Sequence, residues 1–266
     1  MEVPTTGKAA AVWARLARVA DPELDEPVTD LGFIERLSVQ KGAVEVDFRL
    51  PTYWCSPNFA FLMAEGIRRE VAALTWVGQV RVRLLDHLFA DKVNRGVNEG
   101  LAFGTIFAEE EGGDLEELRA IFAEKAFQRR QEAVILALRR AGTGADELCR
   151  MTLGDLGRVR LGDDPGAAEL PRYRAILRET LRAIDPGDPA FVTWGGEALT
   201  PETLPDHMAR LRAVRINMEF NGALCRGLQA ARYRTQPEAE TAPDQPELID
   251  FILNRVPPRE AAASRL

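Results

Sequence analysis

Three cysteines, Cys55, Cys149 and Cys225, and two histidines, His87 and His207, are the strongest metal-ligating and nucleophilic side chains in this sequence of 266 residues. They lie far apart, without a CxxC or a Cys/His cluster, so a zinc site built from neighbouring ligands is not expected. A sparse, odd set of cysteines also argues for a reducing compartment and against a disulfide framework.

Cys55 is the leading candidate because of its place in the chain. It lies in the stretch LPTYWCSPN, residues 50–58, where an alternating strand pattern gives way to a helical pattern. A helix N-terminus offers unpaired N–H groups and the positive end of a dipole, which favour an ionised thiol and metal or persulfide chemistry. The alternative interpretation is a small buried core thiol, and the residues by themselves leave both open.

The other two cysteines are expected to serve packing. Cys149 lies in a short amphipathic segment, and Cys225 lies on a heptad-like seam of a predicted helix over residues 206–233. The remaining seam positions are Leu211, Val214, Met218, Leu228 and the polar Asn221. Asn221 either sets register or partner choice, as in coiled coils, or bonds a neighbouring group. His207 is 18 residues from Cys225, roughly 27 Å along a helix at ~1.5 Å per residue, so the two cannot share a metal within a subunit.

Five carboxylates fall within ten residues near the N-terminus: Asp21, Glu23, Asp25, Glu26 and Asp30. We interpret the segment as a solvated turn whose acids cap turns and helices. The alternative is that one or two of these carboxylates face a metal.

The elements around Cys55 predict which residues share an edge of the sheet. A helix over 8–20 is followed by a hairpin that turns at Lys41-Gly42, and a helix begins at Pro57 and runs to Leu74. A third strand over 77–84 leads into Asp86-His87. If the second and third strands pair in parallel, their carboxyl ends share one edge, which places Asp86 and His87 on the edge that carries Cys55.

Beyond this region the pattern becomes helical. A helix over 91–103 is predicted, with Asp91 as N-cap and with Gly96 and Gly100 allowing close backbone approach. Residues 109–113 indicate a boundary, and a helix over 114–141 with two apolar faces follows. Further helices are expected at 146–156 and 171–184, then a linker at 235–247 and a short apolar helix at 248–253. The predicted fold is therefore an α+β domain, residues 1–108, with a three-stranded mixed sheet and helices. A mainly α-helical domain, 114–234, and a flexible linker with a tail helix, 235–266, complete it.

Composition narrows the functional classes. The net charge is −7 and no long Lys/Arg block occurs, so a nucleic-acid partner is not expected. No apolar run approaches the ~20 residues of a membrane helix, and the N-terminus lacks a signal-peptide pattern, so the expected location is cytoplasmic, away from membranes. GxGxxG, P-loop, GxSxG and HExxH motifs are absent, and Cys55 has no evident triad partner, so we do not expect an enzyme.

The first hundred residues resemble the metal–sulfur (iron–sulfur) cluster assembly factor domain family. The resemblance rests on Asp21-Pro22-Glu23, the stretch VTDLGFI at 28–34, the hairpin, and Pro51-Thr52-Tyr53 followed by a cysteine and Pro57. The stretch CSPNFA at 55–60, with Asp86-His87, is similar to a long-chain branch encoded beside soluble binuclear iron monooxygenases. The family usually places its cysteine directly before the proline, whereas Ser56 holds that position here.

The resemblance implies an accessory maturation factor that delivers iron or an iron–sulfur cluster to a client metalloenzyme. It implies Cys55 as the metal ligand, with Asp86 and His87 as further candidates. It also singles out a motif loop of Thr52, Ser56 and Pro57 and an acidic motif of Asp21, Glu23 and Asp30. Iron or the cluster would be bound transiently. An oxygenase subunit is the expected partner, with a chaperonin or a second copy of the chain as additional candidates. The alternative is a metal-free adaptor or folding chaperone for the same oxygenase.

Overall fold

The computed structural model describes residues 3–4, 6–108, 115–180 and 185–233. Residues up to Arg232 form one compact unit. The predicted boundary at 109–113, the linker at 235–247 and the tail helix at 248–253 lie outside the described residues.

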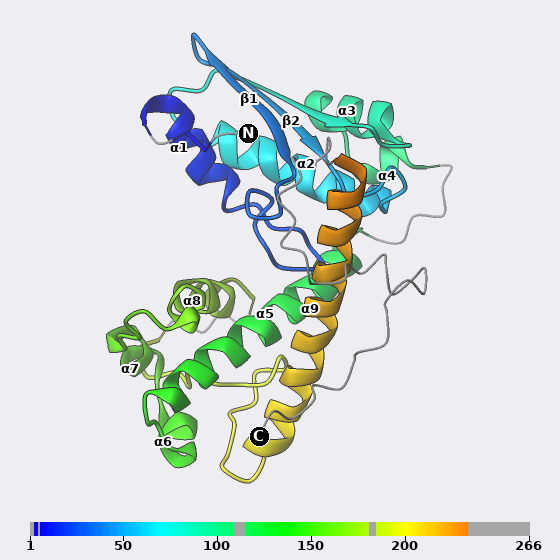
Figure 1. Ribbon diagram of the computed structural model, residues 1–266. Coiled ribbons are helices and arrows are strands. Elements are labelled where there is room, and N and C mark those ends of the chain that lie inside the picture. Colours follow the sequence, from blue (N-terminus) through cyan, green and yellow to red (C-terminus); the bar gives the residue numbers. More distant parts are fainter. Residues whose placement is uncertain (1–2, 5, 109–114, 181–184, 234–266) are drawn as a thin grey trace, which may run out of the picture. The chain divides into compact units, whose positions relative to one another are not determined.

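Three strands form a mixed sheet in the N-terminal part (Figure 1): β1 (Ile34–Gln40), β2 (Ala43–Arg49) and β3 (Gln79–Leu85). The order is β1-β2-β3, with β1 antiparallel and β3 parallel to β2. Lys41 and Gly42 make the hairpin turn with φ of 48° and 88°, the conformation that a two-residue turn of type I′ requires. The predicted mixed sheet and its parallel pairing are confirmed.

The two faces of the sheet differ. Val44, Val46 and Phe48 of β2 are at most 1% exposed and belong to the same core as Ile67 of α2 (Pro57–Ala72). The residues between them point to the other face. There Asp47 of β2 pairs in register with Arg36 of β1 and with Arg83 of β3. Its carboxylate binds Arg36 of β1 at 2.8 Å and Arg83 of β3 at 2.7 Å. One face therefore packs against helices, while cross-strand ion pairs cover the other.

Helix α3 (Ala90–Glu99) covers the outer edge of β3 with two asparagine side chains one turn apart. Asn98 accepts from the N–H of Val82 at 2.9 Å and donates to its carbonyl at 2.8 Å. Asn94 makes the same pair of bonds to Leu84, at 2.7 and 3.1 Å. These amides take the place of a fourth strand and satisfy backbone groups that an edge strand leaves open.

The predicted helix over 91–103 is shorter than expected. Asp91 lies in the first turn, where its charge suits the helix dipole, and the N-cap is Phe89. Gly100 ends the helix with φ of 72°, a left-handed conformation in which glycine avoids steric strain. A Cβ on Gly96 would lie 2.4 Å from the side chain of Ile106, so the close approach at Gly96 is made by a side chain and not by the backbone that was predicted, and among the described residues nothing lies within 4 Å of a Cβ on Gly100.

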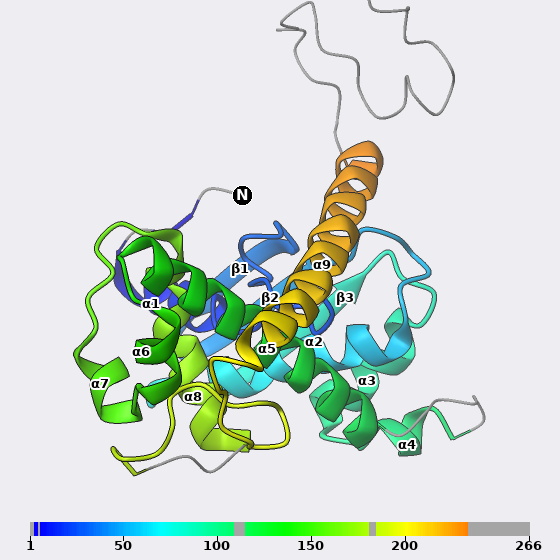
Figure 2. The same cartoon turned by 90° about the horizontal axis from the view of Figure 1, so that it is seen from below.

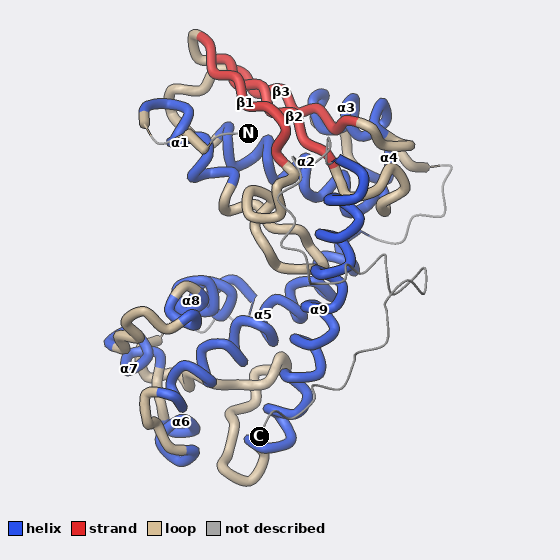
Figure 3. Tube along the Cα trace, in the orientation of Figure 1, coloured by secondary structure: helices blue, strands red, loops and turns tan. Residues whose placement is uncertain are grey.

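The rest of the described chain is mostly helical, as predicted, and Figure 3 shows strands confined to the N-terminal part. A second core lies here and includes Phe127, Leu156, Tyr173 and Phe191. The helices outside the sheet region are α1 (Gly7–Leu16), α4 (Phe103–Ile106), α5 (Leu115–Arg140), α6 (Ala145–Arg150), α7 (Leu153–Arg158), the 3-10 helix η1 (Pro165–Ala167), α8 (Glu169–Thr180) and α9 (Leu204–Tyr233). None of the described helices is long and apolar enough to cross a bilayer.

Helix α9 joins the two cores. It has 30 residues, about 45 Å at ~1.5 Å per residue, and it crosses α5 (Figure 2). Leu211 lies in the helical core, whereas Cys225 packs against the core that contains the sheet. Leu228 is exposed, so the predicted seam is buried over only part of its length.

Candidate functional site

The loop that carries Cys55 connects the end of β2 to α2. Cys55 is half-buried, and its Sγ lies 3.1 Å from the hydroxyl of the buried Thr52. Ser56 is the N-cap residue of α2 without a side-chain cap bond, and Pro57 occupies the first turn. The thiol therefore lies beside a hydroxyl, one residue before the N-cap of a helix whose first N–H groups have no side-chain cap.

His87 holds this loop from the neighbouring strand end. Its Nε2 lies 2.8 Å from the carbonyl oxygen of Cys55, and the N–H of Phe89 donates to Nδ1 over 3.2 Å. Because Nδ1 accepts, Nε2 must carry the proton and donate to Cys55. Burial is the main cause that lowers the pKa of His87 below its usual value. The hydrogen bond to Cys55 raises the pKa by a smaller amount, and the nearby charge of Arg232 lowers it further. The neutral imidazole positions the Cys55 backbone, and metal binding by His87 would require one of these bonds to break.

Asp86 is also at this edge, because Arg49 of β2 is the register partner of Leu85 in β3. The predicted common edge for Cys55, Asp86 and His87 is thus confirmed. Asp86 has φ of 50°, and its carboxylate lies 3.1 Å from Nε of Arg49. Its carbonyl accepts from Arg232 of α9 at 3.0 Å. Metal binding by Asp86 remains a prediction.

The members of the acidic motif have different surroundings. Oδ1 of the buried Asp21 accepts from the backbone N–H groups of Glu23 and Leu24, at 2.9 and 3.0 Å, as the turn-cap interpretation predicts. Burial raises the pKa of Asp21 to about 6, against the opposing effect of these two bonds. Glu23 is near Lys125 and Asn221, at 3.5 and 3.4 Å. Asp30 is exposed, with one bond from Thr29.

A cavity of about 140 Å³ lies between the acidic segment, the Cys55 loop and α9. The residues that line it are Asp21, Glu23, Leu24, Leu50, Pro51, Cys55, Ser56, Phe59, Met63, Asn221 and Cys225. The bond from Asn221 to Glu23 confirms the expectation that this amide serves a neighbouring side chain. Burial raises the pKa of Cys225 to about 11, with contributions from nearby Asp21 and Cys55. The cavity thus brings together two thiols that are far apart in sequence.

Asp25 is the charged residue of this region whose role the sequence did not reveal. It is 3% exposed and has φ of 53°. Its carboxylate binds Arg129 at 3.1 Å, Arg130 at 2.5 Å and Arg172 at 2.7 Å. The acidic segment is thereby fixed to α5 and α8. The sequence does show two adjacent arginines, Arg129 and Arg130, in the middle of a long predicted helix. It does not show which of the five acids near the N-terminus they bind.

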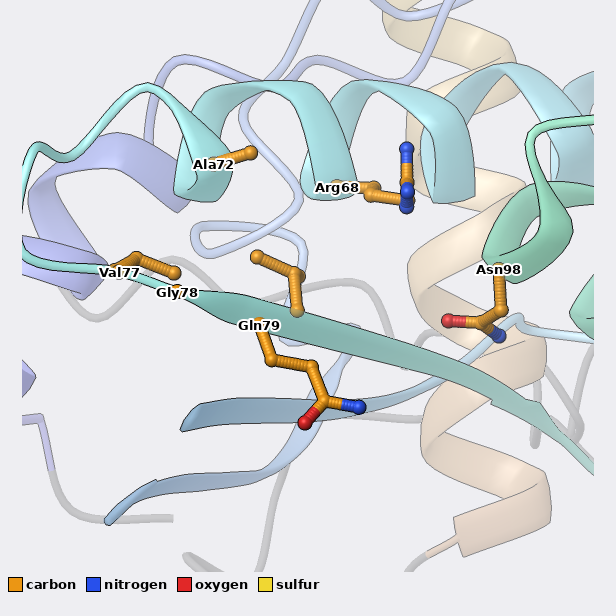
Figure 4. A pocket seen from close by; sticks show the side chains of 7 residues that line it. Arg68, Ala72, Val77, Gly78, Gln79 and Asn98 are labelled. Atoms are coloured by element: carbon orange, nitrogen blue, oxygen red, sulfur yellow. The ribbon is translucent and has the colours of Figure 1, made fainter. Parts of the chain in front are cut away.

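A larger cavity, of about 270 Å³, lies at the opposite end of β3 (Figure 4). It is lined by Arg68, Ala72, Val77, Gly78, Gln79, Val80 and Asn98. It contains neither a thiol nor a carboxylate, and it lies at the start of β3, whereas Asp86 and His87 follow its end. Its size therefore does not make it the candidate site.

The described residues contain no group of three or more His, Cys, Asp or Glu side chains arranged to hold a metal ion. The Cys55 region offers instead a small cavity that is lined by thiols and carboxylates.

The comparisons with known proteins address the part of the chain that carries Cys55. Residues 9–82 match the family model of the iron–sulfur cluster assembly protein. The match includes most of α1, β1, β2, the Cys55 loop and α2, and ends within β3. Asp86, His87 and every helix from α3 onward lie beyond it. Neither the comparison with curated proteins nor that with solved structures found a match. An iron–sulfur cluster assembly domain in the N-terminal part is thus supported, and the general role in cluster assembly that it implies is supported with it.

Proposed function

We propose that this protein is an accessory maturation factor that receives iron or an iron–sulfur cluster at Cys55 and passes it to a client metalloenzyme, a soluble binuclear iron monooxygenase. The observation that carries the proposal is that the family match contains the strand–loop–helix junction bearing the half-buried thiol of Cys55. The metal is cargo, so a site with few ligands is what the function needs. Thr52 lies where its hydroxyl can donate to the thiolate.

The surface beside the loop suits contact with a protein client. Tyr53, Trp54 and Leu88 are 51%, 61% and 66% exposed. The rings of Tyr53 and Trp54 pack edge to face, and the N–H of Leu88 donates to the carbonyl of Tyr53 at 2.8 Å. Exposed aromatic side chains fixed in place bind protein surfaces at low conformational cost, and here they flank the thiol.

Anaerobic reconstitution with ferrous iron and sulfide tests the proposal. Wild-type protein is expected to bind iron, and Cys55→Ala is expected to lose most of it together with activation of the apo-oxygenase. Cys149→Ala is the matched control, because Cys149 is also a half-buried free thiol but lies in α6. Equal iron content and client activation in wild type and Cys55→Ala would exclude cargo handling at this loop.

The second candidate function is a metal-free adaptor or folding chaperone for the same oxygenase. It is favoured by a row of exposed apolar side chains on α9, spaced four residues apart: Ile216, Phe220, Leu224 and Leu228. Such a row follows one helix face and fits a groove on a partner, an oxygenase subunit or a chaperonin. Co-purification with the oxygenase that survives Cys55→Ala but is lost in Phe220→Asp would favour the adaptor over the cargo carrier.

A further inference from the structure

The cavity beside Cys55 has walls from two different parts of the chain. Asp21, Cys55 and Met63 come from the region that matches the cluster assembly family, whereas Asn221 and Cys225 come from α9, outside the match. A second thiol therefore reaches the family's loop from a helix that the family does not supply.

Several contacts hold this part of α9 against the N-terminal part. Arg226, next to Cys225, binds Glu26 at 2.8 Å, and Asn221 lies 3.4 Å from Glu23. One turn further, the amide of Gln229 donates to the carbonyl of Gly32 at 2.9 Å. Because these bonds lie before and after Cys225, its place at the cavity is fixed by its neighbours and does not depend on the thiol itself.

The chemistry of the cavity favours a soft metal. Two thiols, Cys55 and Cys225, and the thioether of Met63 line it, and such sulfur ligands select Zn²⁺, Cu⁺ and the iron of iron–sulfur clusters. The nine-tenths-buried carboxylate of Asp21 also faces it, and among the described residues no hydrogen bond reaches its second oxygen. A volume of about 140 Å³ equals roughly four to five waters at ~30 Å³ each, enough for an ion with part of its hydration shell.

We propose that Cys225 is a second thiol ligand for the metal cargo, so that a divalent iron ion binds between Cys55 on the family loop and Cys225 on α9. The proposal rests on the proposed function and adds a second ligand to the cargo site. Binding forms two iron–sulfur bonds, releases the two thiol protons to solvent and leaves the oxidation state of the metal unchanged.

This arrangement gives a physical route for release. One thiolate belongs to the Cys55 loop and the other to α9, which is held here by the packing of Cys225 against the N-terminal core and by side-chain bonds such as the one between Arg226 and Glu26. Movement of α9 away from the loop would remove one of the two thiolates at once. A client that displaces α9 would thus weaken metal binding while it approaches the exposed residues beside Cys55.

Anaerobic titration with Co²⁺, used as a spectroscopic probe of the Fe²⁺ site, tests the proposal. The intensity of the thiolate-to-cobalt charge-transfer band counts bound thiolates. We expect wild-type protein to bind one Co²⁺ with the intensity of two thiolates. Cys225→Ser is expected to halve this intensity and to weaken binding at least about tenfold, since second-shell changes alone cost 10–100-fold. Cys149→Ser is expected to behave as wild type. Competition with Fe²⁺ should abolish the band.

The outcomes separate the two claims. A band in wild type that disappears in Cys55→Ser but keeps its intensity and affinity in Cys225→Ser would overturn the role of Cys225 while leaving the proposed function intact. No band in wild-type protein would overturn both. Circular dichroism of Cys225→Ser establishes that it is folded. As a second measurement, dibromobimane, which becomes fluorescent when it bridges two nearby thiols, should link Cys55 to Cys225 in wild type, and absence of this link would contradict the geometry.

Discussion

The imidazole of His87 donates from Nε2 to the carbonyl oxygen of Cys55 across 2.8 Å, although the two residues are 32 positions apart. The contact exists because β2 and β3 are parallel neighbours, so that the chain leaves both strands at one edge of the sheet. His87 thus holds the thiol-bearing loop by its backbone, while the N–H of Phe89 fixes the tautomer of the ring.

The first prediction concerns the charge of His87. Its pKa is lowered in the folded state, mainly by burial, so the folded protein resists protonation of this ring. The stability that His87 contributes is present at a pH above the pKa of histidine in the unfolded chain, about 6.5, and it decreases as the pH falls below this pKa. Proton NMR titration should show a pKa below 6.5, and nitrogen shifts should show Nδ1 unprotonated.

The chain has two histidines, so His87→Gln identifies the signal directly. This variant should also accelerate amide exchange in residues 52–56, since the bond to Cys55 is weakened. A His87 pKa at or above 6.5, or a proton on Nδ1, would contradict the role assigned to the ring.

The second prediction concerns Asp21, whose contribution to stability changes with pH in the opposite direction to that of His87. Burial raises its pKa from 3.8 to about 6, so the folded state binds the proton more tightly than the unfolded state. Its effect on stability therefore becomes more favourable as the pH falls from about 6 towards 4. Two pKa units correspond to about 3 kcal/mol in the free energy of unfolding.

Asp21→Asn keeps an acceptor for the two backbone N–H groups but cannot ionise. The variant should gain stability relative to wild type at pH 7, and the difference should shrink by about 2 kcal/mol at pH 4, where the unfolded carboxyl is still partly ionised. Urea unfolding at several pH values measures it. A difference that does not vary with pH would mean that Asp21 is ionised as easily in the folded as in the unfolded state.

The sequence predicted most of the fold because the patterns of β2, α2 and β3 are local. Alternation at Val44, Val46 and Phe48 and the helical spacing from Phe59 to Val71 correspond to elements that the structure contains. The common edge of Cys55 and His87 was predicted on the condition that β2 and β3 pair in parallel, and the structure meets that condition.

Tertiary partners could not be predicted in the same way. Cys225 was expected to pack, and it does pack against the N-terminal core, but its place beside Cys55 depends on how α9 lies against the acidic segment. Asp25 was one of five similar acids, and its burial among three arginines depends on α5 and α8 being brought to the same loop. Neither relationship has a period or a spacing in the sequence.

The third prediction follows from that arginine cluster. Asp25→Asn removes the anion that Arg129, Arg130 and Arg172 share, so these half-buried cations lose a common partner, although Arg129 and Arg172 keep Glu169. We expect a loss of about 3 kcal/mol in the free energy of unfolding, the lower end for breaking a buried pair, since the arginines are partly exposed. Asp30→Asn, at an exposed turn of the same segment, should change stability by less than about 0.5 kcal/mol. Equal effects of the two substitutions in urea unfolding would show that the cluster does not fix the segment.

The last prediction concerns the edge of the sheet. Asn98 makes three hydrogen bonds with its side-chain amide, two to Val82 and one to the carbonyl of Asn94. Asn98→Ala leaves the backbone groups of Val82 without these partners, at a cost of about 1–3 kcal/mol, of which a few tenths are regained because alanine favours the helix. The uncovered edge of β3 should also promote pairing between chains, so light scattering at high concentration should increase. Asn217→Ala, on an exposed position of α9, is the matched control and should alter neither property. Wild-type stability and scattering in Asn98→Ala would mean that water satisfies this strand edge as well as the asparagine does.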